Sequence, residues 1–106
     1  MEIIINSVNF KTGTALDEFV REKVSKLFNQ CNKIIRAHVI LRESKSGTPE
    51  NKLCAIRLMI PGNDHFVRKC SAVYEKSILQ AVEALQKIMR RKKLKELKKD
   101  IPSIHG

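Results

Sequence analysis

Apolar and polar residues alternate in four segments of the chain, and this two-residue period predicts β-strands. A loop containing Gly47 and Pro49 follows the second segment, and the turn-forming residues 61–64 follow the third. The alternation in the first segment shifts at Asn6-Ser7, which predicts a bulge there. The four strands are expected over residues 2–10, 34–43, 52–60 and 65–71.

The two central strands each have one apolar face. In the second and third strands these faces comprise Ile35, Ala37, Val39 and Leu41, and Cys54, Ile56, Leu58 and Ile60, respectively. The opposite faces carry Arg36, His38, Ile40 and Arg42, and Leu53, Ala55, Arg57 and Met59. This division predicts a sheet that is covered on one side and open to water or a partner on the other.

Two further segments have apolar residues at helical spacing. The first helix is expected to begin at Thr14, a good N-cap residue, and to end near residues 29–32. The second is expected to run from about Ala72, with Ser71 as its cap, to about Leu97. The buried stripes comprise Leu16, Val20, Val24 and Leu27 in the first helix, and Ile78, Val82, Leu85 and Met89 in the second. Past Met89 apolar residues are few, so the second helix should leave the body of the protein there.

The predicted order of elements is β-α-β-β-β-α. A right-handed crossover through the first helix makes the first two strands parallel, and the later strands form an antiparallel meander. Each helix has one apolar stripe, so both should pack on the same face of the sheet. The sequence therefore predicts an α+β two-layer sandwich with a four-stranded sheet and two helices packed on one face.

Basic residues are in large excess, and they are concentrated near the C-terminus. The chain of 106 residues contains 21 Lys and Arg against 11 Asp and Glu, a net charge of +10. Cations near the end of a helix complement its dipole, but eight in one cluster repel each other. A polyanion relieves this repulsion, and nucleic acid is the commonest such partner. The cluster comprises Lys87, Arg90, Arg91, Lys92, Lys93, Lys95, Lys98 and Lys99.

The first helix extends the basic character, with Arg21, Lys23 and Lys26 away from its apolar stripe. The spacing of Glu22 and Lys26 favours an ion pair between them. Aromatic residues are scarce, and Tyr74 is the one candidate for an exposed ring, with packing against the edge of the sheet as its alternative. This composition disfavours recognition of splayed single-stranded bases and favours recognition of folded RNA by shape and phosphates.

Sequence motifs of common enzymes are absent. The chain has no P-loop, no G-x-S-x-G and no H-E-x-x-H, and its three histidines lack metal-ligand spacing. Cys31, Cys54 and Cys70 are interpreted as reduced core residues, and without a signal sequence they indicate a cytoplasmic protein. No run approaches the roughly 18 apolar residues that span a bilayer. We therefore expect a binding protein with no enzymatic activity, metal, cofactor, small-molecule substrate or membrane partner.

Five short motifs follow one another at characteristic spacing. They are the helix opening at Thr12–Leu16, V-x-x-K-[VL]-x-K-L at Val20–Leu27, A-H-V-I-L at Ala37–Leu41, I-P-G-N at Ile60–Asn63 and I-x-x-A-[VI]-x-x-L at Ile78–Leu85. Together they resemble the ribosome hibernation-promoting factors, also called the ribosome-associated inhibitor or protein Y family. The resemblance covers residues 1–97, which is nearly the whole chain.

This resemblance implies a translation inhibitor that binds the small ribosomal subunit and its rRNA between head and body under starvation or stress. Such a protein occupies the tRNA and mRNA path, competes with both, and grips rRNA with basic helices. The residues at basic family positions are Lys23, Lys26, Lys87 and Arg91, and His38 matches a histidine in the second strand of some members. The density of charge adds Arg90, Lys92, Lys93 and Lys95.

Two departures from the family pattern change what is expected of this chain. Val73 precedes Tyr74 where many members have an acidic residue, so either Ser71 caps the second helix or the helix start shifts. The sequence also has no counterpart of the C-terminal domain with which long-type members pair ribosomes, so it resembles the short type. One ribosome-binding domain is expected over residues 1–99, followed by a short tail at 100–106.

Two alternatives remain at the level of sequence. A double-stranded RNA-binding domain shares the α-β-β-β-α part of the order, but it carries its basic motif at the start of the last helix, where only Lys76 lies here. A protein-interaction regulator would instead dock a partner on the open face of the sheet, through Ile40, Leu53 and Met59. Truncation of the basic helix end distinguishes the two mechanisms, because only an RNA-driven function depends on it.

Overall fold

The structure, a computed structural model, describes residues 2–8, 13–44, 47 and 49–100, with side chains as far as Arg91. These residues form four strands and two helices in the predicted order β-α-β-β-β-α. The elements are β1 (Glu2–Ser7), α1 (Thr14–Gln30), β2 (Arg36–Glu43), β3 (Lys52–Met59), β4 (His65–Ser71) and α2 (Tyr74–Asp100).

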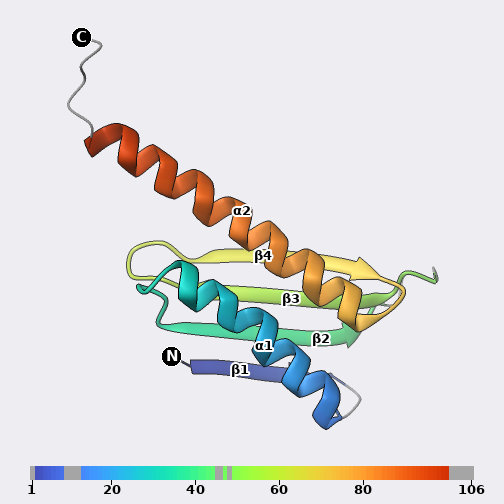
Figure 1. Cartoon of the computed structure of the whole chain (residues 1–106). Coiled ribbons are helices and arrows are strands. Elements are labelled where there is room, and N and C mark those ends of the chain that lie inside the picture. Colours follow the sequence, from blue (N-terminus) through green and yellow to red (C-terminus); the bar gives the residue numbers. More distant parts are fainter. Residues whose placement is uncertain (1, 9–12, 45–46, 48, 101–106) are drawn as a thin grey trace.

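The strands form a single sheet in the order β1-β2-β3-β4. β1 is parallel to β2, and the pairs β2–β3 and β3–β4 are antiparallel. Both helices lie on one face of this sheet, with α1 in front of β1 and β2 and α2 in front of β3 and β4 (Figure 1). The predicted α+β two-layer sandwich is therefore confirmed.

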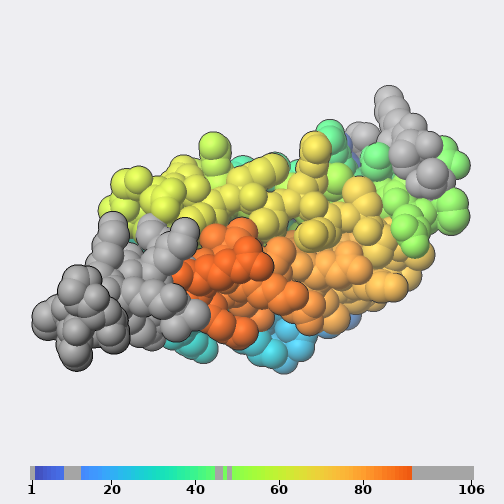
Figure 2. Space-filling view, turned by 90° about the horizontal axis from the view of Figure 1, so that it is seen from above, coloured from blue at the N-terminus to red at the C-terminus, as the bar shows by residue number. Residues whose placement is uncertain are grey.

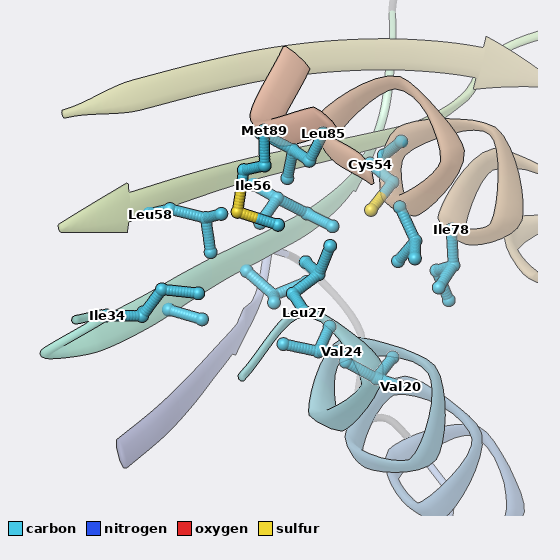
Figure 3. Packing of buried hydrophobic residues seen from close by; sticks show 14 of the residues in the cluster. Val20, Val24, Leu27, Ile34, Cys54, Ile56, Leu58, Ile78, Leu85 and Met89 are labelled. Atoms are coloured by element: carbon cyan, nitrogen blue, oxygen red, sulfur yellow. The ribbon is translucent and has the colours of Figure 1, made fainter. Parts of the chain in front are cut away.

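The hydrophobic core lies between the sheet and the two helices. The largest fully buried side chains come from both layers and include Leu27 of α1, Leu41 and Ile56 of the sheet, and Ile78 and Leu85 of α2. Figure 3 shows these groups converging from the helices and from one face of β3. The apolar stripes therefore do what their spacing predicts, because a helix and a sheet each bury one face against the other.

Two details of the first strands differ from the sequence prediction. The pairing of Asn6 with Ile40 and of Ser7 with Leu41 continues the parallel register without an extra residue, so the predicted bulge is wrong. Residue 10, where the strand was expected to end, lies outside the described residues. Ile35 is 57% exposed, whereas Ile34 is buried, because β2 begins at Arg36, two residues later than predicted. Outside the strand, strict alternation of faces no longer holds.

Both helices begin differently from what the capping residues predict. Gly13, in an extended conformation, is the N-cap of α1, and Thr14 is already helical. α2 begins at Tyr74, and the Ser71 hydroxyl donates to the Val73 carbonyl (2.6 Å) instead of capping the helix. Ser77, which is fully buried, lies 2.9 Å from the Ser71 hydroxyl and donates to the Lys52 carbonyl (2.5 Å). Of the two alternatives raised by Val73, the shifted helix start is therefore the one observed.

The β3–β4 turn is tight and depends on a glycine. The Asn63 amide donates to the Ile60 carbonyl (2.9 Å), which closes a four-residue turn. Gly62 has a φ of +80°, a conformation that other residues adopt only with strain. The longer β2–β3 loop is closed by a hydrogen bond from the Ser44 amide to the Asn51 carbonyl (2.7 Å). These turns fix which residues of the meander face each other.

The side of the sheet away from the helices is called the open face here. No described element covers it (Figure 1). It carries every second residue of each strand, as the alternation predicts. Its members in the described strands are Glu2, Ile4, Asn6, Arg36, His38, Ile40, Arg42, Leu53, Ala55, Arg57, Met59, Phe66, Arg68 and Cys70.

α2 extends past the sheet, as Figure 1 shows. Its 27 residues span roughly 40 Å at 1.5 Å each, whereas the eight-residue strands span roughly 27 Å. Met89 is the last residue of α2 that contributes to the described core. The predicted departure of the helix from the body past Met89 is thus confirmed. In the described part of the chain, neither helix has the length and apolar character needed to cross a membrane.

Candidate nucleic-acid interface

Three of the predicted site residues lie on one flank of α2, just where the helix leaves the sheet. Lys87, Arg90 and Arg91 are all exposed. Their spacing of three and four residues places them on the same side of the helix. No carboxylate among the described side chains forms an ion pair with any of the three. These cations are therefore uncompensated and directed to solvent.

A groove of about 650 Å³ runs between this flank of α2 and the edge strand β4. Figure 2 shows β4, in yellow, lying along α2, in orange. The groove has an apolar part, formed by Val67, Ala84 and Ile88, and its charged residues are four cations and one carboxylate. The charged residues are Arg68 and Lys69 of β4 and Glu83, Lys87 and Arg91 of α2. Two rows of positive charge thus flank one depression, which suits a phosphate backbone.

Arg68 and Lys69 were not among the residues predicted from the sequence. They stand alone in a short strand, 18 positions or more before the cluster on α2, and no sequence signal joins them to it. The fold brings them together because β4 is the edge of the sheet on the side that α2 covers. Their place at the groove follows from the packing of β4 beside α2. A count of charges along the sequence does not reveal this packing.

α1 contributes one free cation and one that is partly engaged. Lys26 is exposed and has no ion-pair partner among the described side chains. Lys23 is half-buried, with its ammonium 3.7 Å from a Glu22 carboxylate oxygen and 5.4 Å from the Phe19 ring centroid. Glu22 therefore pairs with its neighbour Lys23. The pairing with Lys26 that the spacing predicted is not observed in the described part of the chain. Of the two predicted residues, Lys26 is the better placed to meet an anion.

The two helices present their basic residues on one layer of the molecule. They lie side by side on the same face of the sheet (Figure 1), and the Gln30 side chain of α1 donates to the Gln86 carbonyl of α2 (3.1 Å). Three further predicted residues lie further along α2: Lys92, Lys93 and Lys95. Their side chains lie outside the described residues, so their role stays a prediction. The basic residues of both helices that the structure describes therefore lie on the same layer of the molecule, as far as Arg91.

His38, which the family resemblance added to the candidate RNA-binding residues, does not belong to this surface. It lies on the open face, and its Nε2 atom is 2.8 Å from the Asn6 side-chain amide. Arg57 lies directly across from it on β3. The sheet separates His38 from every basic residue of the helices. If His38 contacts RNA, it does so from the opposite side of the protein.

Of the two alternatives expected for Tyr74, packing is the one observed, and a different aromatic residue is exposed. Tyr74 packs against the core, and the Lys52 ammonium lies 5.8 Å from its ring centroid. Burial, more than the nearby Glu43 carboxylate, raises the pKa of the Tyr74 hydroxyl, and the Lys52 charge opposes this shift. Phe66 of β4 is instead 57% exposed, on the open face. The sequence signal that could have found Phe66 is the alternation of faces along β4, which places it on the same face as Arg68 and Cys70.

The three cysteines occupy three different environments, and all are free thiols. Cys54 is fully buried, Cys31 is half-buried at the end of α1, and Cys70 is exposed on the open face. The interpretation of every cysteine as a core residue is therefore wrong for Cys70, because its strand position faces away from the helices. Among the described residues, no group of three His, Cys, Asp or Glu side chains is arranged to hold a metal ion.

Thiol reactivity should follow this order in the native protein. Burial raises the pKa of Cys54 from 9.0 to about 12, so its thiolate fraction at neutral pH falls about a thousandfold. We expect Ellman's reagent to modify Cys70 rapidly and Cys54 only after unfolding. Replacement C70S should remove the rapid phase and leave the slow one. Because the raised pKa keeps the folded thiol protonated, the stability linked to Cys54 is complete below about pH 9 and declines toward pH 12.

A rapid phase that survives in C70S would show that Cys54 or Cys31 is reached in the native state. The stability decline is checked by urea unfolding at stepwise higher pH, with C54A as the reference that lacks the titrating group. In C54A the part of the decline above pH 9 that belongs to this thiol should be absent.

Fold and surface together define a small α+β protein with a basic helical layer suited to bind a polyanion. Residues 3–96 match the family described as Sigma 54 modulation protein / S30EA ribosomal protein. This match spans most of the chain, and the chain therefore belongs to that family. The resemblance drawn from the sequence motifs is confirmed at this level. Curated proteins yield no significant sequence match.

Solved structures share the fold. One described as a ribosomal subunit interface protein from Coxiella burnetii is similar with a TM-score of 0.78 and 19% identity, over 89% of this chain and 99% of that one. The Protein Y N-terminal domain of Thermus thermophilus is similar with a TM-score of 0.68 and 22% identity, over 85% of this chain and 93% of that one. At these identities the likeness concerns the fold alone.

Proposed function

We propose that the protein is a non-catalytic, cytoplasmic translation inhibitor that binds the small ribosomal subunit. The basic helical layer grips rRNA, and the body of the protein occupies the path of tRNA and mRNA in ribosomes made idle by stress or starvation. Residues 1–99 act as one ribosome-binding domain, and 100–106 form a tail. Family membership supports a ribosomal partner for this chain.

The observation that carries the proposal is the uncompensated basic flank beside the groove. Exposed Lys87 and Arg91 on α2 and Lys69 on β4 line one depression. Exposed Arg90 lies on the same flank of α2, and Lys26 adds to the same layer. Such a surface binds phosphate and releases condensed counterions, which makes affinity depend steeply on salt. The same surface does not read base edges, so it suits the shape and backbone of folded rRNA.

Co-sedimentation with ribosomes and with isolated subunits tests the proposal. We expect the protein to sediment with the small subunit and to be displaced by tRNA. Four phosphate contacts predict a slope of about −4 for the logarithm of affinity against the logarithm of salt concentration. Binding that is independent of salt, or unaffected by tRNA, would contradict the proposal. Retention on plain duplex RNA without ribosome binding would favour a double-stranded RNA-binding function instead.

A further inference from the structure

The open face carries a row of residues that no proposed contact of the helical layer uses. The strand pairing places Ile4, His38, Arg57 and Phe66 side by side across the four strands. Three of these side chains end in planar groups: an imidazole, a guanidinium and a phenyl ring. No element that the structure describes packs against this face, so these groups are accessible to a ligand that is itself planar.

Below the surface of the open face lies an apolar floor. Leu53 and Ala55 are only 6% and 4% exposed, although no helix covers them. Ala55 lies between Ile40 and Arg68 in the pairing, and Leu53 lies between Arg42 and Cys70. The longer neighbours shield them, because arginine stems cover apolar surface while the guanidinium stays in water. Leu53 is therefore not available as the docking residue that the sequence suggested.

All the cations of the open face are arginines. Of the seven arginines in the chain, four lie here, and no lysine does. Arg36 pairs with Glu2, and the Arg57 guanidinium lies 3.9 Å from an Asp64 carboxylate oxygen. No carboxylate in the described part of the chain pairs with Arg42 or Arg68. The face is thus net positive and complements an anion.

Phe66 gives this positive face a stacking surface. Its ring is 57% exposed, Arg57 lies directly across from it, and Arg68 follows two positions along the same strand. Residues two apart on a strand are about 6.8 Å apart, which is twice the 3.4 Å rise of stacked bases. One base can therefore lie between the two positions. Phenyl and guanidinium planes both stack on bases, whereas a lysine ammonium does not.

We propose that the open face binds single-stranded RNA, with a base stacked on Phe66 and the phosphates held by Arg57, Arg68 and Arg42. The bases of a duplex are stacked inside the helix and do not reach such a surface, so single strands are selected. This site lies on the other side of the sheet from the helices, and Arg68, on the edge strand β4, borders both this site and the groove beside α2. The protein therefore contacts two RNA segments at once, one on each side of the sheet.

Fluorescence anisotropy with a short labelled oligouridylate tests the proposal at low salt. We expect F66A to weaken binding about tenfold or more, since the ring on which a base stacks is removed. F66W, which keeps a planar ring, should retain binding. V73A removes an apolar side chain of similar exposure outside the sheet and should leave binding unchanged. An unlabelled RNA duplex should displace the oligouridylate poorly.

Nuclear magnetic resonance locates the site independently of the variants. Addition of oligouridylate should shift backbone amides of β2, β3 and β4, and should do so also in a protein that carries R90E and R91E. Equal affinities of F66A and V73A, or shifts confined to α1 and α2, would overturn the proposal. Because the helical variant leaves the open face intact, failure of this site and failure of ribosome binding through the helices give separate results.

Discussion

Replacement of Arg90 and Arg91 by glutamate is expected to weaken binding to the small ribosomal subunit by on the order of a hundredfold or more. Both side chains are exposed on the same flank of α2, where Arg91 lines the groove, and neither has an ion-pair partner among the described side chains. Each reversal replaces an attraction to phosphate by a repulsion. The salt dependence should fall as well, by about one unit of slope for each phosphate that is no longer neutralised.

The measurement is co-sedimentation of R90E/R91E with small subunits over a salt series. The matched control is R90K/R91K, which keeps both charges and should lose much less affinity, because a lysine ammonium still binds phosphate as a point charge. Thermal unfolding of both variants should match that of the parent, since surface substitutions typically change stability by less than about 0.5 kcal/mol. If R90E/R91E unfolds at a much lower temperature, the cluster has a structural role and the interpretation is wrong.

Truncation of Leu85 to alanine is expected to lower the free energy of unfolding by about 3–4 kcal/mol. Leu85 is fully buried and belongs to the cluster that joins α2 to α1 and to the sheet (Figure 3). Removing most of its side chain reduces apolar burial and leaves a cavity where both helices meet. For a domain of this size the midpoint of thermal unfolding should fall by roughly 15 °C or more.

Urea unfolding followed by circular dichroism measures this change. L79A is a matched control, because it makes the same substitution in the same helix at a side chain that is 40% exposed. Helix propensity changes equally in both variants, so the difference between them isolates burial. Similar decreases in stability for L85A and L79A would mean that the buried and solvent sides of α2 are assigned incorrectly.

The sheet and its helical cover were predictable because their residues repeat with a clear period. Ala37, Val39 and Leu41 alternate through β2, and the stripe ending at Met89 keeps one face of α2 apolar until the helix leaves the sheet. The period of the apolar residues indicates which face of an element is buried, and this period can be seen in the sequence alone. The order of elements then left few arrangements, since the crossover has a preferred hand.

Element ends were less predictable, because they depend on groups that compete locally. Thr14 and Ser71 are both good capping residues, but Gly13 caps α1 and the Ser71 hydroxyl is used by the Val73 carbonyl. Ile35 looked like a core residue until the strand start placed it outside the sheet. Each of these outcomes depends on a single hydrogen bond or on where a strand begins to within a residue. Composition and spacing do not determine such details.

The candidate site was predictable where it lies on one helix and not where it is shared between elements. Lys87, Arg90 and Arg91 are close in sequence, so their charge density is visible directly. Lys69 joins them only because β4 forms the sheet edge beside α2. His38 was grouped with the helices by family resemblance, and the face to which β2 assigns it separates it from them.

The parallel pairing of β1 also constrains the order in which the protein can assemble during its own synthesis. β2, β3 and β4 are joined by short connections and can pair soon after each is made. Among the described strands, β1 pairs with β2 alone. Glu2 can pair with Arg36 only after the 34 residues that separate them have been made. Such a separation carries a larger closure entropy than a hairpin. β1 is therefore left without its sheet partner until α1 and then β2 have been made.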